Sequence, residues 1–185
     1  VRSLQREIIM SDRDWKKGQN DPENPPEIGM RLARKLGMIS YRSAQEWRDR
    51  FSRERVVNQP AETTPFGIDF EIESYLDAHA RKFTGRFDPN CYVYLSRAMD
   101  LYDLGEHSGC IATELSRASM RRALVIGVES DILFPLHQQQ ELAECLEAEG
   151  REVTFAALPS IQGHDSFLVD MDRFRPVVAK FFDQF

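Results

Sequence analysis

Hydrophobic positions follow a helical period through the first two thirds of the chain. In several stretches apolar residues recur every three or four positions, and polar or proline-rich breaks separate these stretches. A serine with a glutamate three residues later, at 43 and 46, is a typical helix start. The pattern predicts helices over residues 1–11, 29–41, 43–51, 69–83, 89–102 and 111–120, and loops over 18–28, 52–67 and 103–109.

The pattern changes at residue 123. Residues 123–128 and 153–158 are short apolar runs, typical of strands that are buried on both faces. Residues 136–150 and 171–185 follow them as amphipathic helices, the first ended by Gly150. The order strand, helix, strand, helix predicts a right-handed βαβ unit in a parallel sheet. Because two strands do not complete such a sheet, we interpret this part as the end of a larger α/β domain, with a helical insert before it.

A carboxylate and an imidazole follow the two predicted strands. Asp131 comes just after the first strand, and His164 follows the second, 33 residues later. The carboxyl ends of parallel strands meet at one edge of a sheet, where function gathers. There the carboxylate can accept a hydrogen bond from one imidazole nitrogen and leave the other as a base. Gly163 would allow an unusual backbone in this loop. The alternative is that Asp131 only caps the segment that follows it.

A nucleophile for this pair is not evident in the chain. No Gly-x-Ser-x-Gly turn follows a predicted strand. Ser108 follows a helix and a turn, and Ser160 lies in the same loop as His164, so neither fits the order serine, acid, histidine. The other histidines have weaker claims: His79 lies on a helix face, His107 lies in a polar loop, and His137 opens a helix without an evident partner.

Composition excludes several other classes of function. The chain has 185 residues, a net charge of −6 and no apolar stretch near the roughly 20 residues that span a bilayer, so we expect neither a nucleic-acid nor a membrane partner. The basic cluster at 31–35 is interpreted as a solvated helix face. No secretory signal is evident and the three cysteines are widely spaced, which favours free thiols in the cytoplasm. A metal site is not predicted, since no second histidine accompanies the acidic group Asp165, Asp170 and Asp172.

Five segments, in the correct order, resemble motifs of the homoserine O-acetyltransferase family. They are residues 33–43, 70–76, 87–100, 123–135 and 158–168. The resemblance implies an α/β-hydrolase fold with a helical lid inserted between its later strands. It divides the chain into the end of a first core segment (1–17), a lid region (18–120) and a C-terminal core (121–185). The residues that carry the acid and the histidine lie in that core.

The family's activity is a two-step acyl transfer. The resemblance implies that a serine takes the acyl group from acetyl-CoA or succinyl-CoA and passes it to the hydroxyl of homoserine or serine, in methionine or cysteine biosynthesis. Acyl-CoA would be a co-substrate, no cofactor would stay bound, and a homodimer through the lid helices is expected. The segments 129–135 and 138–140 look more like the branch that acylates serine.

The resemblance also implies roles for individual residues. Asp131 and His164 match the acid and the base. Arg34 and Tyr41 match lid residues that face the substrate, where a guanidinium suits a carboxylate. Asp165 matches a position that pairs with the substrate ammonium. The simpler interpretations are a surface ion pair for Arg34, a packed aromatic for Tyr41 and a loop cap for Asp165.

The half of the family's sequence that carries the nucleophile is absent from these 185 residues. We therefore interpret the chain as a fragment that is inactive by itself. Two other functions stay open at this point. One is hydrolysis of an ester by the same triad, and the other is a non-catalytic module derived from the fold.

Overall fold

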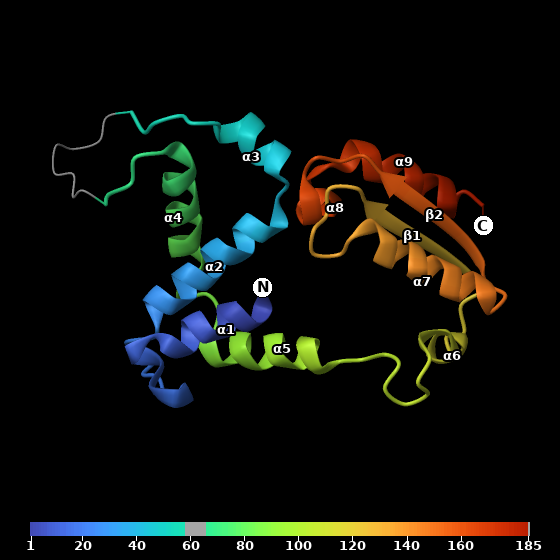
Figure 1. Cartoon of the computed structure of the whole chain (residues 1–185), viewed down its shortest axis with the longest axis horizontal. Helices are drawn as coiled ribbons and strands as arrows, with labels where there is room; N and C mark the ends of the chain where they lie inside the picture. The colour runs from blue at the N-terminus through green and yellow to red at the C-terminus, as the bar shows by residue number, and fades with distance from the viewer. Residues whose placement is uncertain (58–65, 185) are drawn as a thin grey trace. The chain divides into compact units, whose positions relative to one another are not determined.

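The computed structural model describes residues 1–57 and 66–184 (Figure 1). The chain forms two compact units, which are described separately. The N-terminal unit comprises Val1–Ile39 and Trp47–Tyr102, and the C-terminal unit comprises Ser40–Glu46 and Asp103–Phe185. The short stretch Ser40–Glu46, called the 40–46 segment below, thus packs with residues that lie far downstream in the sequence.

The N-terminal unit is helical, as the periodicity predicts. Its helices are α1 (Arg2–Ser11), α2 (Glu27–Tyr41), α3 (Ala44–Phe51), α4 (Glu71–Phe83) and α5 (Pro89–Leu101), of which α2 and α3 extend into the 40–46 segment. The short 3-10 turn η1 (Arg13–Gly18) was not predicted from the pattern. Helix α2 begins two residues earlier than expected, and an early helical bond runs from the Met30 N–H to the Pro26 carbonyl. Part of the predicted connection 52–67 lies outside the described residues.

Helices α1 and α2 pack closely in this unit. Ile9, Met30 and Ala33 form its buried core. Their contact requires a glycine, because a β-carbon on Gly29 would lie 2.9 Å from the carbonyl oxygen of Ile8. The close approach lets apolar side chains of both helices share one core.

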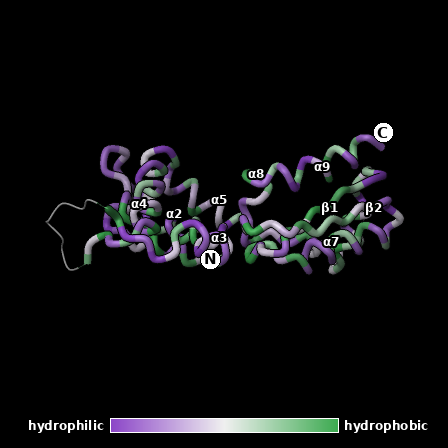
Figure 2. The backbone as a smooth tube through the Cα atoms, turned by 90° about the horizontal axis from the view of Figure 1, so that it is seen from above, coloured by the Kyte–Doolittle hydropathy of each residue, from purple (hydrophilic) through white to green (hydrophobic). Residues whose placement is uncertain are grey.

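The C-terminal unit contains a parallel pair of strands. β1 (Arg122–Val128) pairs with β2 (Glu152–Leu158) from Arg122↔Glu152 to Val128↔Leu158. Helix α7 (Leu136–Ala148) connects the strands and packs on both, while α9 (Met171–Phe182) contacts β2. Figure 2 shows the strands between these two helices. The predicted strand, helix, strand, helix order is confirmed, and the core is formed by Val125, Ala143 and Leu146.

Three details of this unit differ from the predictions. β2 is not buried on both faces: Glu152, Thr154 and Ala157 are exposed, because one helix on each side covers two strands only partly. Helix α6 (Ile111–Ser116) ends before residue 120, and the Arg151 guanidinium binds the Ser116 carbonyl at its end at 2.7 Å. The turn η2 (Gly163–Asp165) and the short helix α8 (Ser166–Val169) were not predicted.

The two later helices end two and three residues before the predicted positions. Helix α7 ends at Ala148, and Gly150 follows in the left-handed region at φ +76°, which confirms it as a helix terminator. Helix α9 ends at Phe182, and residue 185 lies outside the described part of the chain. Within the described ranges, no helix combines the length and the apolar character that crossing a lipid bilayer demands.

Candidate active site

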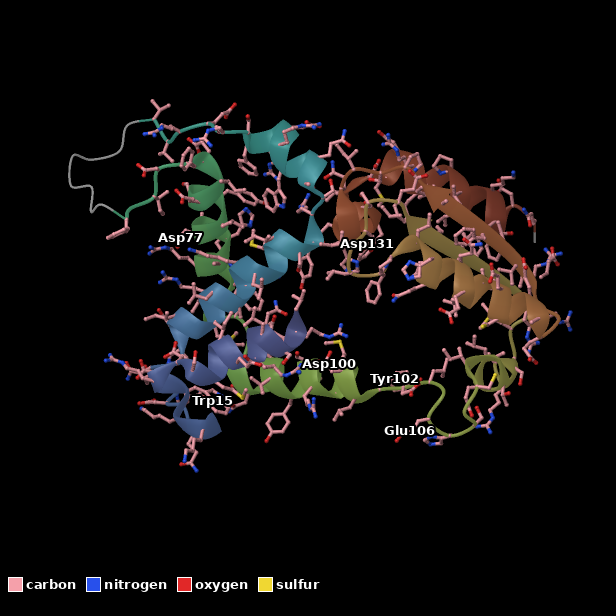
Figure 3. The ribbon with its side chains drawn as sticks, in the orientation of Figure 1. Trp15, Asp77, Asp100, Tyr102, Glu106 and Asp131 are labelled. Atoms are coloured by element: carbon pink, nitrogen blue, oxygen red, sulfur yellow. The ribbon has the colours of Figure 1, made fainter. Side chains whose placement is uncertain are left out.

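The structure brings Asp131 and His164 into direct contact. Asp131 lies in the loop after β1, residues 129–135, which we call the acid loop (Figure 3). Its Oδ2 is 2.9 Å from His164 Nδ1. Its Oδ1 accepts hydrogen bonds from the backbone N–H groups of Leu133, at 2.8 Å, and Phe134, at 3.0 Å. One oxygen thus fixes the carboxylate to its own loop, and the other faces the imidazole.

This geometry assigns the two nitrogens of His164. An ionised carboxylate is only an acceptor, so Nδ1 carries the proton that is shared with Asp131. The Nε2 atom then holds the lone pair that a general base needs. The side chain of Asp131 is 9% exposed and that of His164 is 24% exposed. The pair is shielded enough to interact strongly, and the imidazole remains accessible.

Aromatic rings surround the imidazole. The ring centroid of His164 is 4.9 Å from that of Phe134, 5.7 Å from that of Tyr41 and 6.1 Å from that of Phe167. A cavity of about 430 Å³ adjoins the pair. Its walls come from β1, the acid loop, α7, η2, α8 and α9: Ile126, Gly127, Val128, Asp131, Phe134, Gln139, His164, Phe167 and Phe174.

The loop that carries His164, residues 159–165 and called the histidine loop, is tied to the acid loop. Gly163 has φ +64°, which confirms the expected unusual backbone before the histidine. The Ser130 hydroxyl donates to the Ser160 carbonyl at 2.6 Å and accepts from the Gly163 N–H at 3.1 Å. Ser130, the neighbour of Asp131, is therefore bound to Gly163, the neighbour of His164.

Buried serines complete the support of the histidine loop. Ser160 and Ser166 are 2% and 0% exposed. The Ser160 hydroxyl is 2.6 Å from Asp170 Oδ2, and the Ser166 hydroxyl is 2.6 Å from the Gly163 carbonyl oxygen. The hydrogen bond from Ser160, aided by Arg173, lowers the pKa of Asp170. The hydroxyl of Ser160 is thus engaged in hydrogen bonds with Asp170 and Ser166.

The three residues expected to bind substrate lie in different units. Tyr41 and Asp165 belong to the C-terminal unit with the Asp131–His164 pair, and Asp165 Oδ2 is 3.1 Å from Arg42 Nε. Arg34 belongs to the N-terminal unit, where its guanidinium lies 5.1 Å from the centroid of the Phe83 ring. Its Nε is buried and has no hydrogen-bond partner within the described residues.

His79 belongs to the N-terminal unit, and the other weaker candidates belong to the C-terminal unit. His79 packs on Tyr75, with ring centroids 4.3 Å apart, and His107 and His137 are exposed. The Ser108 hydroxyl donates to the Cys110 carbonyl at 2.9 Å. Across residues 1–57 and 66–184, no group of three histidine, cysteine, aspartate or glutamate side chains could hold a metal ion.

Sequence reasoning missed several residues that shape this site. Ser130 and Phe134 flank Asp131 in the same motif, so their position could have drawn attention to them. Arg42 and Phe167 also lie in motif segments, 33–43 and 158–168, but nothing in those segments indicates which residues they contact. The partners of Arg42 lie about 120 residues downstream, at Gln162 and Asp165, and only the fold brings them together.

Comparison with known proteins adds relatives of known name. No family model matches the chain. A serine O-succinyltransferase of Xylella fastidiosa (strain M12) is 52% identical over all 185 residues, and one of Stenotrophomonas maltophilia (strain K279a) is 52% identical over 184 residues. These alignments cover 100% and 99% of the chain and 50% of each relative, so the chain spans about half the length of the curated relatives it matches.

Solved structures share the fold. Homoserine O-acetyltransferase from Bacillus anthracis matches with a TM-score of 0.81 at 22% identity, over 96% of this chain and 47% of that one. Esterase E22 matches with a TM-score of 0.75 at 20% identity, over 92% of this chain and 46% of that one. The predicted α/β-hydrolase fold is thus confirmed.

The sequence relatives point to one family within this fold. Half of the chain's residues are identical to those of the serine O-succinyltransferases, so its sequence is related over its whole length to the homoserine and serine O-acyltransferases. The resemblance that the five motifs indicated is therefore confirmed.

Proposed function

We propose that this chain supplies the acid and the base of an acyl-CoA-dependent O-acyltransferase. The observation that carries the proposal is the Asp131–His164 contact at 2.9 Å, in a chain that is 52% identical to serine O-succinyltransferases over its whole length. These relatives are about twice as long as this chain. The nucleophilic serine would come from a segment that corresponds to their other half. That segment could belong to the same polypeptide or to a separate one.

The proposed reaction has two steps. In the first, His164 Nε2 takes the proton of the serine nucleophile, whose oxygen attacks the acyl-CoA thioester. The carbon–sulfur bond breaks, and the CoA thiol leaves with the proton from the imidazole. In the second, His164 takes the proton of the substrate hydroxyl, and that oxygen attacks the serine ester. The serine leaves with its proton restored, and the acyl group is on the substrate. In both steps Asp131 stabilises the imidazolium.

In this proposal serine is the acceptor and a succinyl group is transferred, in line with the names of the two serine O-succinyltransferases. CoA as the carrier of that group is what the family resemblance implies. An amino acid presents a carboxylate and an ammonium group. The guanidinium of Arg34 suits the carboxylate. Asp165 suits the ammonium, with one of its oxygens already beside Arg42. Tyr41, next to His164, would limit the space beside the reacting hydroxyl.

The setting of the activity belongs to the same proposal. We place it in the cytoplasm, in cysteine or methionine biosynthesis, with acyl-CoA as co-substrate and without a metal. A homodimer through the lid helices is supported by large apolar side chains that α5 and the residue after it leave exposed: Tyr94, Leu95, Met99, Leu101 and Tyr102. Light scattering across a dilution series tests this part: a monomer at every concentration would contradict it.

The test of the activity uses a joined protein, in which the upstream half of the Xylella fastidiosa relative precedes residues 1–185. Free CoA is measured with a thiol reagent, and mass spectrometry identifies O-succinylserine. We expect CoA release from succinyl-CoA to depend on serine. Equal release without any amino acid would favour an esterase, and no release by a folded protein would favour a non-catalytic module.

A further inference from the structure

One guanidinium holds the residues on both sides of His164. Arg42 lies in the 40–46 segment, which belongs to the C-terminal unit together with the histidine loop. Its Nη1 donates to Gln162 Oε1 at 3.1 Å, and its Nε is 3.1 Å from Asp165 Oδ2. The two partners bracket Gly163 and His164 in the sequence. The planar fork of arginine can therefore set the distance across the turn that presents the imidazole.

The guanidinium itself is fixed from its own segment. Arg42 Nη1 pairs at 2.5 Å with Oε1 of Glu46, four residues further along the chain. The Arg42 side chain is 16% exposed, and those of Glu46 and Asp165 are 8% and 22% exposed. A partly buried guanidinium between two carboxylates loses little freedom on binding a third partner, because its rotamer is already set.

The backbones of the two segments also interlock. The Ser43 hydroxyl donates to the carbonyl of Ile161. Gly163 turns against the same segment so tightly that a β-carbon there would lie 2.6 Å from the Tyr41 carbonyl oxygen and 3.0 Å from Arg42 C. The 40–46 segment thus packs along the histidine loop, and Arg42 adds an ion pair with Asp165 to this contact.

We propose that Arg42 is a positioning residue for His164. It acts through Gln162 and Asp165, holds the η2 turn in place, and keeps Nδ1 directed at Asp131 and Nε2 directed at the reacting hydroxyl. General-base catalysis depends steeply on such placement, since a shift of about 1 Å can cost roughly 100-fold in rate. The inference rests on the proposed function for its effect on rate, but the effect on the imidazole is independent of any activity.

The test compares Arg42→Met with Arg42→Lys in the joined protein. We expect Arg42→Met to lower kcat by about 10- to 100-fold with KM changed less than about threefold. The pH profile of kcat should shift as well, because the imidazole no longer faces Asp131 in one fixed geometry. Lysine keeps the charge but not the fork, so Arg42→Lys should recover only part of kcat. The matched control is Arg117→Met, which breaks the ion pair of an exposed guanidinium with the largely buried Glu114 and should leave kcat within twofold.

A second readout is nitrogen-15 NMR of the histidine side chains. In the unmodified protein His164 should show a protonated Nδ1, and Arg42→Met should shift that signal, whereas Arg117→Met should not. An unchanged His164 signal and unchanged kcat in folded Arg42→Met would overturn the inference. A shifted signal in a protein without acyltransferase activity would support Arg42 as a positioning residue and contradict the proposed function alone.

If Arg42→Met does not fold, Gln162→Ala takes its place. This variant removes one of the two contacts that bracket the histidine and keeps both ion pairs of Arg42. We expect a fall of about threefold in kcat with a smaller shift of the His164 signal in the same direction. A Gln162→Ala protein with neither change would contradict the proposed role.

Discussion

Gly163 meets the backbone of Tyr41 so closely that a single added β-carbon would lie 2.6 Å from the Tyr41 carbonyl oxygen. The atoms in its way belong to the main chain, so no side-chain rotation can relieve the contact. The same glycine has φ +64°, a conformation that costs other residues about 1–2 kcal/mol. The histidine loop and the 40–46 segment can therefore pack in this manner only around a glycine.

We predict that Gly163→Ala destabilises the C-terminal unit by about 3 kcal/mol, the sum of backbone strain and overpacking. The matched control is Gly150→Ala. Gly150 has φ +76° but nothing within 4 Å of its added β-carbon, so it should lose only about 1 kcal/mol. Urea unfolding followed by far-UV circular dichroism measures both. Equal losses in the two variants would mean that the loop yields to the extra carbon.

Asp131→Asn should separate catalysis from folding. The asparagine carbonyl oxygen can still accept from Leu133 and Phe134, but its amide would face Nδ1 and favour the wrong tautomer of His164. We expect kcat of the joined protein to fall by about 10³- to 10⁴-fold, with a change in unfolding free energy below about 1 kcal/mol.

The control for this variant is Asp49→Asn, on an exposed aspartate whose partner is the neighbouring Arg48. It should keep full activity. Retention of most activity by Asp131→Asn would show that another group orients the imidazole. A large loss of stability would show that Asp131 acts first as a cap of the acid loop.

Sequence patterns could predict the elements and the Asp131–His164 pair, but not the residues that hold this pair in place. The apolar runs of β1 and β2 and the helix between them place Asp131 and His164 at the same sheet edge, so spacing alone suggested their contact. That logic needs only one strand and one helix between two residues. It is a local property of the sequence, and the structure bears it out at 2.9 Å.

The role of Arg42 has no such local signature. Its contact with Gln162 joins residues 120 positions apart, and it depends on the packing of the 40–46 segment within the C-terminal unit. The partial exposure of β2 was missed for a related reason: apolar residues indicate a strand, but the number of helices available to cover it is a property of the assembled unit. Both the contact of Arg42 and the partial exposure of β2 depend on how distant segments pack together. Hydrophobic periodicity does not predict such packing.

We expect the buried serines of the histidine loop and α8 to stabilise the C-terminal unit. Ser160→Ala removes the hydrogen bond to Asp170 and leaves the buried Ser166 hydroxyl with one contact fewer. We expect a loss of about 1–3 kcal/mol, the usual cost of a buried polar group without its partner. The pKa of Asp170 should also rise toward its ordinary value, since that hydrogen bond is the main cause of its lowering.

Ser108→Ala is the comparison for Ser160→Ala. Ser108 is exposed, so the variant should change stability by less than about 0.5 kcal/mol. Chemical denaturation gives both free energies, and carbon-13 NMR of the aspartate carboxyl groups follows the titration of Asp170. A Ser160→Ala protein as stable as Ser108→Ala would mean that water replaces the lost hydroxyl.

Asp77 predicts an acid-dependent change in the N-terminal unit. Its carboxylate is 2.8 Å from Lys35 Nζ and 2.5 Å from Arg81 Nε, and these hydrogen bonds lower its pKa from 3.8 to about 2. Because the pKa is lower in the folded state, the carboxylate stabilises the fold fully above the unfolded value. That contribution is lost as the pH falls from about 4 through 2.

We therefore expect Asp77→Asn to lower the free energy of unfolding by about 1–2 kcal/mol at pH 7, a value reduced by the exposure of Arg81. The difference from the unmodified chain should stay constant down to about pH 5 and shrink toward zero near pH 2. Both tryptophans, Trp15 and Trp47, lie in the N-terminal unit, so their fluorescence reports its urea unfolding at each pH. A difference that does not change between pH 7 and pH 2 would show that Asp77 contributes by packing rather than by charge.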